Sequence, residues 1–170
     1  MATIEIPMIG FSVAPDSSGD VFIEPLESAM TLSTAVLGNL QCMTMLAPTG
    51  TNIGFHGSFT IPQNYAGTPV CVIRGYLGEA ANTLGFGIQQ LAVAHSDPLD
   101  TVLEAEDVAS NATWTGLVAE DAYEETITLT PGSAYVAGDI VNYFFFRDDG
   151  VDTQNGEFHL ADLAFRYSDT

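Results

Sequence analysis

Residues 138–150 read Gly138-Asp139-Ile140-Val141-Asn142-Tyr143-Phe144-Phe145-Phe146-Arg147-Asp148-Asp149-Gly150, and this stretch decides the fold. Successive side chains of a β-strand point to opposite faces, so this strand would be apolar on both. Ile140, Phe144 and Phe146 lie on one face, and Val141, Tyr143 and Phe145 on the other. Aromatic and β-branched residues favour strands, and the flanking Gly-Asp and Asp-Asp-Gly segments are turn chemistry. We therefore predict a central strand of a β-sandwich, covered on both sides.

The composition is that of one globular domain with an unusual charge balance. Of 170 residues, 46% are hydrophobic and only 15% are charged, which is not typical of a disordered chain. Asp and Glu number 22 against three arginines and no lysine, so the net charge is -19. Nucleic acids and anionic membranes need a basic surface, so we predict neither as a partner. The acidity fits a saline environment or the outside of a large acidic particle.

The first 29 residues differ from the rest of the chain. They contain neither a basic segment followed by an apolar run nor a long apolar stretch, so we expect no signal peptide and no transmembrane helix. Prolines interrupt an apolar series that consists of Ile4, Ile6, Met8, Ile9 and Phe11. We predict an extended N-terminal arm and loop over residues 1–29, held either against its own domain or on a neighbouring subunit. A single β-sandwich domain would occupy residues 30–170.

Other segments alternate or contain short apolar runs bounded by turn residues. We expect strands at 31–36, 41–46, 53–61, 70–77, 84–94, 113–117, 123–130 and 158–167. The polar segment 95–112 is expected to be a loop, with one helical turn beginning at Asp97-Pro98. Short strands without strand–helix alternation indicate an all-β antiparallel sandwich, with a jelly roll as the first choice.

No arrangement of reactive side chains indicates an enzyme, a cofactor or a metal. His56, His95 and His159 lie in separate segments without metal-ligand spacing. Nucleophile-elbow and phosphate-loop motifs are missing from the sequence. The loop 147–152 partly matches a calcium loop, but it lacks the full spacing and the closing Glu, so an acidic hairpin loop is preferred. Cys42 and Cys71 lie in apolar runs, so we expect two buried thiols rather than a disulfide.

Three aromatic residues near turns, Trp114, Tyr123 and Tyr135, could stack on sugar rings. Packing in the core or at an interface is the preferred interpretation, because aromatic residues dominate both.

Three segments together resemble β-sandwich virion proteins of tailed bacteriophages, namely head decoration (cement) proteins and capsid or tail fibre modules. They are Phe55-His56-Gly57-Ser58-Phe59-Thr60-Ile61-Pro62-Gln63-Asn64-Tyr65-Ala66-Gly67-Thr68-Pro69, residues 138–148, and Leu163-Ala164-Phe165-Arg166-Tyr167-Ser168-Asp169. The likeness covers residues 53–169 and concerns the pattern of strand and turn residues rather than a catalytic motif. It implies a non-enzymatic structural protein, usually a trimer, on the particle surface, and it transfers no functional residue.

These observations predict a phage head decoration protein, made in the host cytoplasm and located on the capsid surface of the virion. It would bind the major capsid protein as a homotrimer, with Ile4, Ile6, Met8, Ile9 and Phe11 as interface residues. The alternative is a phage tail or capsid fibre module that binds host-surface glycans, with Trp114 and Tyr135 as the first suspected contacts. A cellular carbohydrate-binding module is a third hypothesis. It is weaker, because such modules normally accompany a catalytic domain.

Overall fold

The structure is a computed structural model of the whole chain. It describes residues 2–8, 21–22, 31–32, 43–45, 50, 52–77, 82–94, 107–111, 118–119, 121–130, 134–154 and 156–169. For residues 21–22, 31–32 and 107–111 only the backbone is described.

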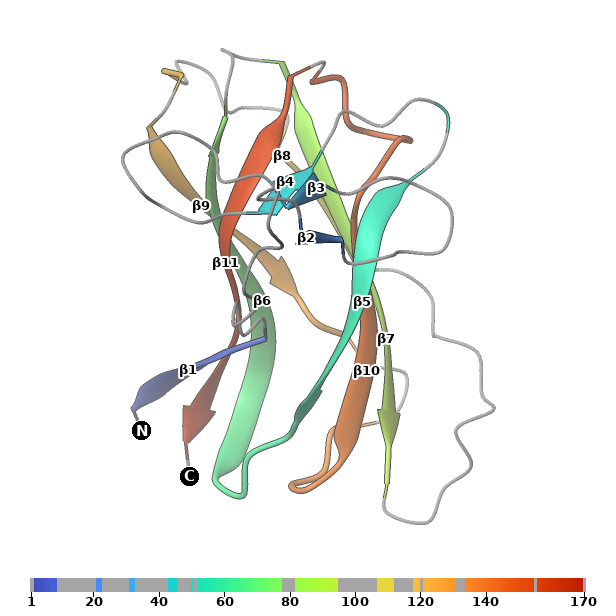
Figure 1. Cartoon of the computed structure of the whole chain (residues 1–170). Coiled ribbons are helices and arrows are strands. Elements are labelled where there is room, and N and C mark those ends of the chain that lie inside the picture. The colour runs from blue at the N-terminus through green and yellow to red at the C-terminus, as the bar shows by residue number, and fades with distance from the viewer. Residues whose placement is uncertain are drawn as a thin grey trace.

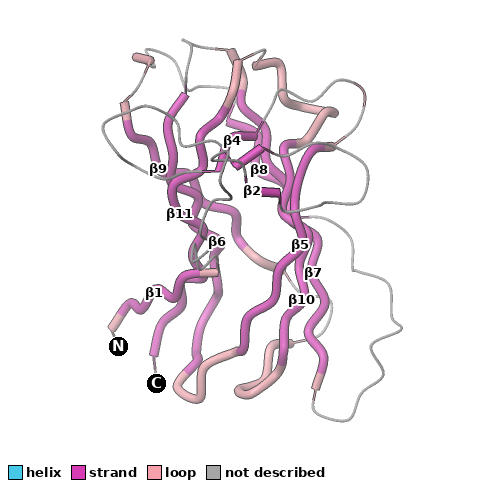
Figure 2. The backbone as a smooth tube through the Cα atoms, in the orientation of Figure 1, coloured by secondary structure: helices cyan, strands magenta, loops and turns pink. Residues whose placement is uncertain are grey.

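The described part of the chain forms eleven strands and contains no helix (Figure 2). None of its segments is therefore a helix that could cross a membrane. The strands are β1 (Thr3–Pro7), β2 (Val21–Phe22), β3 (Thr31–Leu32), β4 (Met43–Met45), β5 (Ile53–Thr60), β6 (Tyr65–Leu77), β7 (Leu84–Val93), β8 (Asp107–Asn111), β9 (Ala122–Thr128), β10 (Ile140–Arg147) and β11 (Phe158–Asp169).

Two antiparallel sheets pack face to face (Figure 1). The seven-stranded sheet has the order β2-β3-β4-β11-β6-β9, with β1 paired to β11, and the four-stranded sheet has the order β5-β10-β7-β8. Strands β4 to β7 thus pair in turn with β11, β10, β9 and β8, as in a long hairpin rolled into two sheets. This arrangement is a jelly roll, so the predicted fold class is confirmed.

Strand β10 lies inside the four-stranded sheet, paired with β5 on one side and β7 on the other. Val141, Tyr143 and Phe145 point into the core between the sheets. The opposite face is covered only at one end, because Phe146 is fully buried, Phe144 is half-buried and Ile140 is 49% exposed. The prediction of a central strand is confirmed, and the prediction of cover on both sides holds only near Phe146.

Two glycines make room for the buried ring of Phe146. Gly54 of β5 and Gly87 of β7 are its direct neighbours across the sheet. A Cβ atom at Gly87 would overlap the ring, and one at Gly54 would overlap the backbone of β10. These positions therefore need glycine for a close approach of neighbouring groups.

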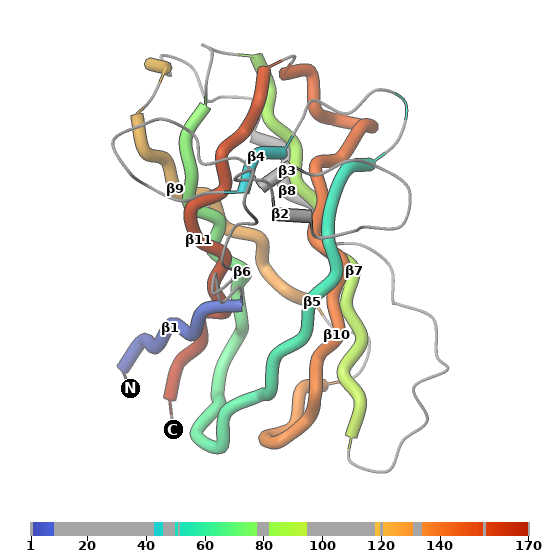
Figure 3. The backbone as a smooth tube through the Cα atoms, in the orientation of Figure 1, coloured from blue at the N-terminus to red at the C-terminus, as the bar shows by residue number. Residues whose placement is uncertain are grey.

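The start of the N-terminal arm belongs to the same domain as the rest of the chain. β1 pairs with β11, and the two chain ends lie side by side (Figure 3). Ile4 and Ile6 are half-buried against the core and Met8 is buried within it. The Met8 carbonyl accepts a hydrogen bond from the Tyr143 hydroxyl at 3.1 Å. Of the two alternatives for the arm, the structure shows attachment to its own domain, and Ile9 and Phe11 lie outside the described residues.

Two segments differ from the sequence-based expectations. The polar segment 95–112 contains strand β8 at its end, so the prediction of a loop is wrong for residues 107–111. Its polar residues are compatible with this place, because among the described strands β8 lies at the end of its sheet and pairs with β7. Strand β6 begins at Tyr65, earlier than the expected residue 70. The expected helical turn at Asp97 and strand at 113–117 lie outside the described residues.

Candidate ligand-binding face

The outward side of the four-stranded sheet carries a regular grid of side chains, which we call the β10 face. The strand register sets three adjacent rows, which are His56–Phe144–Gln89, Ser58–Asn142–Leu91 and Thr60–Ile140–Val93. Rows lie two residues apart and strands about 4.8 Å apart, so the grid measures roughly 14 by 10 Å. Its edge on β5 is exposed. Its centre and its edge on β7 are half-buried, apart from the exposed Ile140 and the buried Val93. A grid of this size can contact a short extended ligand.

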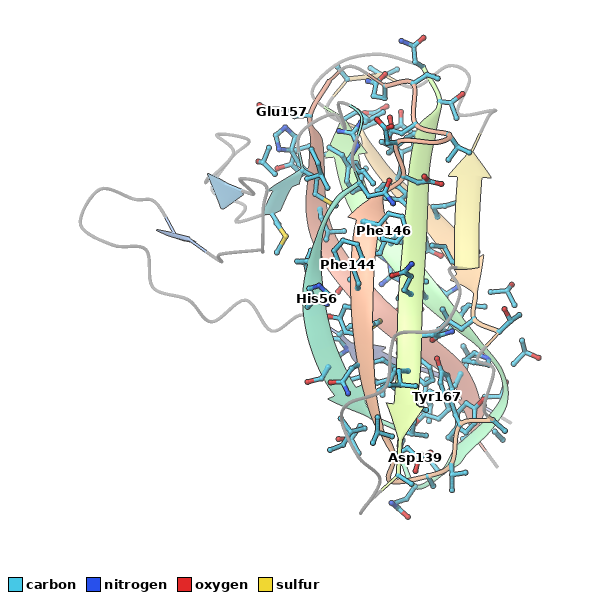
Figure 4. The ribbon with its side chains drawn as sticks, turned by 90° about the vertical axis from the view of Figure 1, so that its right-hand side faces the viewer. His56, Asp139, Phe144, Phe146, Glu157 and Tyr167 are labelled. Atoms are coloured by element: carbon cyan, nitrogen blue, oxygen red, sulfur yellow. The ribbon has the colours of Figure 1, made fainter. Side chains whose placement is uncertain are left out.

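Three aromatic rings form a stack at one end of the β10 face. Phe144 stacks on His56 with ring centroids 4.7 Å apart, and on Phe146 with centroids 5.0 Å apart. Figure 4 shows the three side chains in a column over the strands of this sheet. Phe146 is buried and His56 is exposed, so the stack presents its ring surface to solvent at the His56 end.

Polar side chains beside the stack are not used within the fold. In the part of the chain that the structure describes, Ser58, Gln89 and Asn142 form no side-chain hydrogen bond. Amides offer both donors and acceptors, and a hydroxyl offers one donor and two acceptor positions. These groups are therefore available to a ligand.

Among the described residues, the β10 face carries no Asp, Glu, Lys or Arg side chain. Strands β5, β7 and β10 contain no Asp or Glu, and their single arginine, Arg147, points inward and is fully buried. Arg147 donates two hydrogen bonds to Asp152, at 2.8 and 3.0 Å. The other two arginines, Arg74 and Arg166, lie in β6 and β11 of the other sheet. Because the sequence has only three Lys and Arg residues, no described or undescribed segment can bring another one to this face.

The outward side of the seven-stranded sheet is different, because its charges are already paired with each other. Arg74 contacts Glu5, Glu124 and Asp162 at 2.7 to 2.9 Å, and Arg166 contacts Glu5 and Glu124. Hydrogen bonds from Arg74 and then Arg166 lower the pKa of Glu5, and those from Arg166 and then Arg74 lower the pKa of Glu124. Burial lowers the pKa of Arg74, but its carboxylate partners raise it overall. This network joins β1, β6, β9 and β11 and pairs these charged groups with one another.

A groove of about 300 Å³ lies beside this network. Its lining includes Arg74, Tyr76, Ala122, Tyr123 and Glu124. Arg74 and Glu124 are paired at 2.9 Å, and the Tyr76 ring packs against His159 with centroids 4.9 Å apart. The groove therefore offers fewer available polar groups than the β10 face, and we prefer the β10 face as the candidate site.

Of the aromatic residues suspected from the sequence, the structure describes Tyr123 and Tyr135, and neither hydroxyl is unpaired. Tyr135 is only 6% exposed, donates a hydrogen bond to Gln90, and packs against Tyr65 and Phe165, so it belongs to the core. The hydroxyl of Tyr123 bonds to the backbone of residue 118, and Trp114 lies outside the described residues. The preferred interpretation of Tyr135 as a packing residue is confirmed, and it is not available for sugar stacking.

His159 and the acidic loop have structural roles. His159 is buried, and its Nδ1 atom lies 3.0 Å from the Thr44 hydroxyl. Burial lowers the pKa of His159, and the nearby Glu157 opposes this effect. In the loop, Asp148 accepts from the Gly150 amide, and Asp149 accepts from the Gly50 amide. No cluster of His, Cys, Asp or Glu among the described residues could hold a metal ion.

Cys71, the thiol that the structure describes, is free and fully buried. Its burial raises its pKa, so it has no features of a reactive thiol. The other predicted thiol, Cys42, lies outside the described residues.

Sequence reasoning did not find the residues of the β10 face, although one signal was present. From the sequence alone, His56 lacks metal-ligand spacing and is expected on a strand face, and Asn142 and Phe144 are expected only as strand residues. Three strands without a carboxylate, in a chain with 22 of them, indicate a surface kept free of charge. The strand register was needed to show that these strands are neighbours.

Comparisons with known proteins assign no family. No protein-family model matches the sequence, and no curated protein matches it. A solved structure described as a "Family 16 Carbohydrate Binding Module-2" is similar over 80% of this chain and 84% of its own, with 14% identity and a TM-score of 0.44. This degree of likeness does not assign a ligand to the present chain. The resemblance to phage virion proteins finds no counterpart among these matches and stays a prediction.

Proposed function

We propose that this protein is a glycan-binding module whose ligand lies on the β10 face. The observation that carries the proposal is an aromatic stack that ends at the exposed His56 ring, next to amide and hydroxyl groups on strands without Asp, Glu or Lys. Sugar rings have apolar C–H faces and polar hydroxyl rims, so they need both kinds of contact. The β10 face provides them in adjacent rows.

Each row offers a distinct type of contact. At one end, the exposed ring of His56 offers a flat surface beside the amide of Gln89, and Ser58 and Asn142 offer hydrogen bonds in the middle row. Ile140 provides apolar surface at the other end. Strand β10 is paired with β5 on one side and β7 on the other, so Asn142 and Ile140 project from a central strand and need little ordering on binding.

The experiment is isothermal titration calorimetry of the purified protein with a panel of neutral oligosaccharides. We expect at least one to bind with a Kd below about 1 mM. Asn142→Ala and His56→Ala should each weaken that binding by about two- to tenfold, the value of one net hydrogen bond or ring contact. Thr128→Ala is the matched control, since Thr128 is an exposed strand residue on the outward side of the other sheet.

Two results would contradict the proposal. One is that no neutral oligosaccharide binds, and the other is that both β10-face variants bind as tightly as the unchanged protein.

The place of this module on a phage particle is a separate proposal, supported by the sequence resemblance. The glycan-binding fibre module fits the β10 face better than the head decoration protein does. The reason is that Ile4, Ile6 and Met8, chosen as capsid contacts, already pack within their own domain. Homotrimer formation and capsid binding stay predictions, as does the non-enzymatic nature of the chain. Light scattering and binding tests on purified capsids would check the first two.

A further inference from the structure

We infer that the β10 face selects uncharged glycans and rejects acidic ones, such as those that contain uronic acids or sulfate groups. This inference rests on the proposed function and goes beyond it, because a glycan site could in principle accept either kind. The inference rests on where the three arginines of the chain lie. All three are in ion pairs away from this face, and the chain has no lysine.

A carboxylate or sulfate on a ligand needs a positively charged or strongly donating partner when it loses its water. The β10 face offers no Lys or Arg donor; its donors are the amides of Asn142 and Gln89, the hydroxyls of Ser58 and Thr60, and the His56 ring. These groups can pair with sugar hydroxyls without leaving a charge unpaired. An acidic sugar at the same position would lose hydration without gaining an ion pair.

The charge of the whole molecule adds a second, longer-range penalty. With a net charge of -19, the protein repels an anion before any contact forms. The Debye length is about 30 Å at 0.01 M salt and about 3 Å at 1 M, so this repulsion acts across the domain at low salt and vanishes at high salt. For one ligand charge near the surface, we expect a loss of about tenfold in affinity at low salt and less than about twofold at 1 M.

The test uses a matched pair of oligosaccharides that differ only by oxidation of one hydroxymethyl group to a carboxylate. Their Kd values are measured by calorimetry at low and at molar salt. We expect the neutral sugar to bind equally in both, and the acidic sugar to bind about tenfold more weakly at low salt, with a smaller gap at molar salt.

A charge placed on the β10 face separates local from global effects. Ser58→Lys and Thr128→Lys change the net charge equally, but only Ser58 lies on the β10 face. We expect Ser58→Lys to close most of the gap between the two sugars and Thr128→Lys to leave it nearly unchanged. Light scattering of the same samples reports whether the face is instead buried between two copies of the chain.

The outcomes distinguish the inference from the proposed function. If the acidic sugar binds as tightly as the neutral one at low salt, the selection for uncharged glycans is wrong and glycan binding stands. If Ser58→Lys and Thr128→Lys act alike, the ligand does not lie on the β10 face. If neither sugar binds, or if Ser58→Lys only dissociates an oligomer, both the inference and the proposed function are wrong.

Discussion

Replacing Arg147 with methionine should cost a large part of the stability of the domain. The guanidinium group has no exposed surface, and neither does the carboxylate of Asp152 that it contacts. It also donates hydrogen bonds of 2.9 to 3.0 Å to the carbonyls of Met45, Gln154 and Gly156. Methionine would leave a buried carboxylate without its cation and three carbonyls without a donor.

The size of this effect follows from the burial of the pair. Removing one partner of a buried ion pair costs about 3–5 kcal/mol, and native domains are stable by only about 5–15 kcal/mol. Arg74→Met is the control, because its ion pairs are about one-third exposed and surface ion pairs contribute about 1 kcal/mol or less. Both variants are measured by urea unfolding at neutral pH.

Arg147→Lys covers the case in which the methionine variant does not fold. Lysine keeps the charge but cannot form the bidentate contact with Asp152. We therefore expect the free energy of unfolding to fall by an amount between those of Arg147→Met and Arg74→Met. A loss in the free energy of unfolding of less than about 1 kcal/mol for Arg147→Met, or one no larger than that of Arg74→Met, would show that the buried ion pair does not stabilise the domain.

Three further predictions concern other parts of the fold. Gly87→Ala should cost about 1–3 kcal/mol in urea unfolding, because the added methyl group overlaps the ring of Phe146; an unchanged midpoint would contradict this packing. Glu5→Gln should speed hydrogen exchange in β1 at neutral pH. Folding lowers the pKa of Glu5, so the ion pairs of Glu5 stabilise the fold above the ordinary pKa of 4.5, and this stabilisation is lost as the pH falls through the lowered folded pKa. Equal exchange in both proteins at neutral pH would show that these ion pairs do not hold β1 in place. Burial lowers the pKa of His159, so protonation favours the unfolded chain, and stability should fall as the pH drops below its ordinary value of 6.5. His159→Phe should remove that part of the pH dependence, and identical pH profiles would show that His159 does not cause it.

Much of the fold follows from local patterns in the sequence. Alternation at residues 53–61 and the apolar run at 140–147 define strands that the structure contains at nearly the same bounds. Turn residues separate these strands, and the absence of strand–helix alternation favours a sandwich. The jelly-roll order depends on long-range pairing, which no local pattern contains, so the sequence supports it only as the commonest choice.

The candidate site could not be found in the same way. Phe144 and Phe145 are adjacent aromatic residues, and nothing local shows that Phe145 enters the core while Phe144 faces outward. The assignment needs Gly87 on the neighbouring strand and the packing of the second sheet. Because both faces of β10 are apolar, the sequence predicts that both are buried. In the structure the outward face is exposed at the end near Ile140.

The most direct test of the account is to map the bound ligand on the protein by NMR. Backbone amide shifts are followed while a neutral oligosaccharide that binds in calorimetry is added. If the ligand lies on the β10 face, the largest changes fall in residues 56–60, 89–93 and 140–144, on the strands that form this face. Changes confined to the groove beside Tyr76 and Ala122 on the other sheet, or no changes at all, would contradict the account.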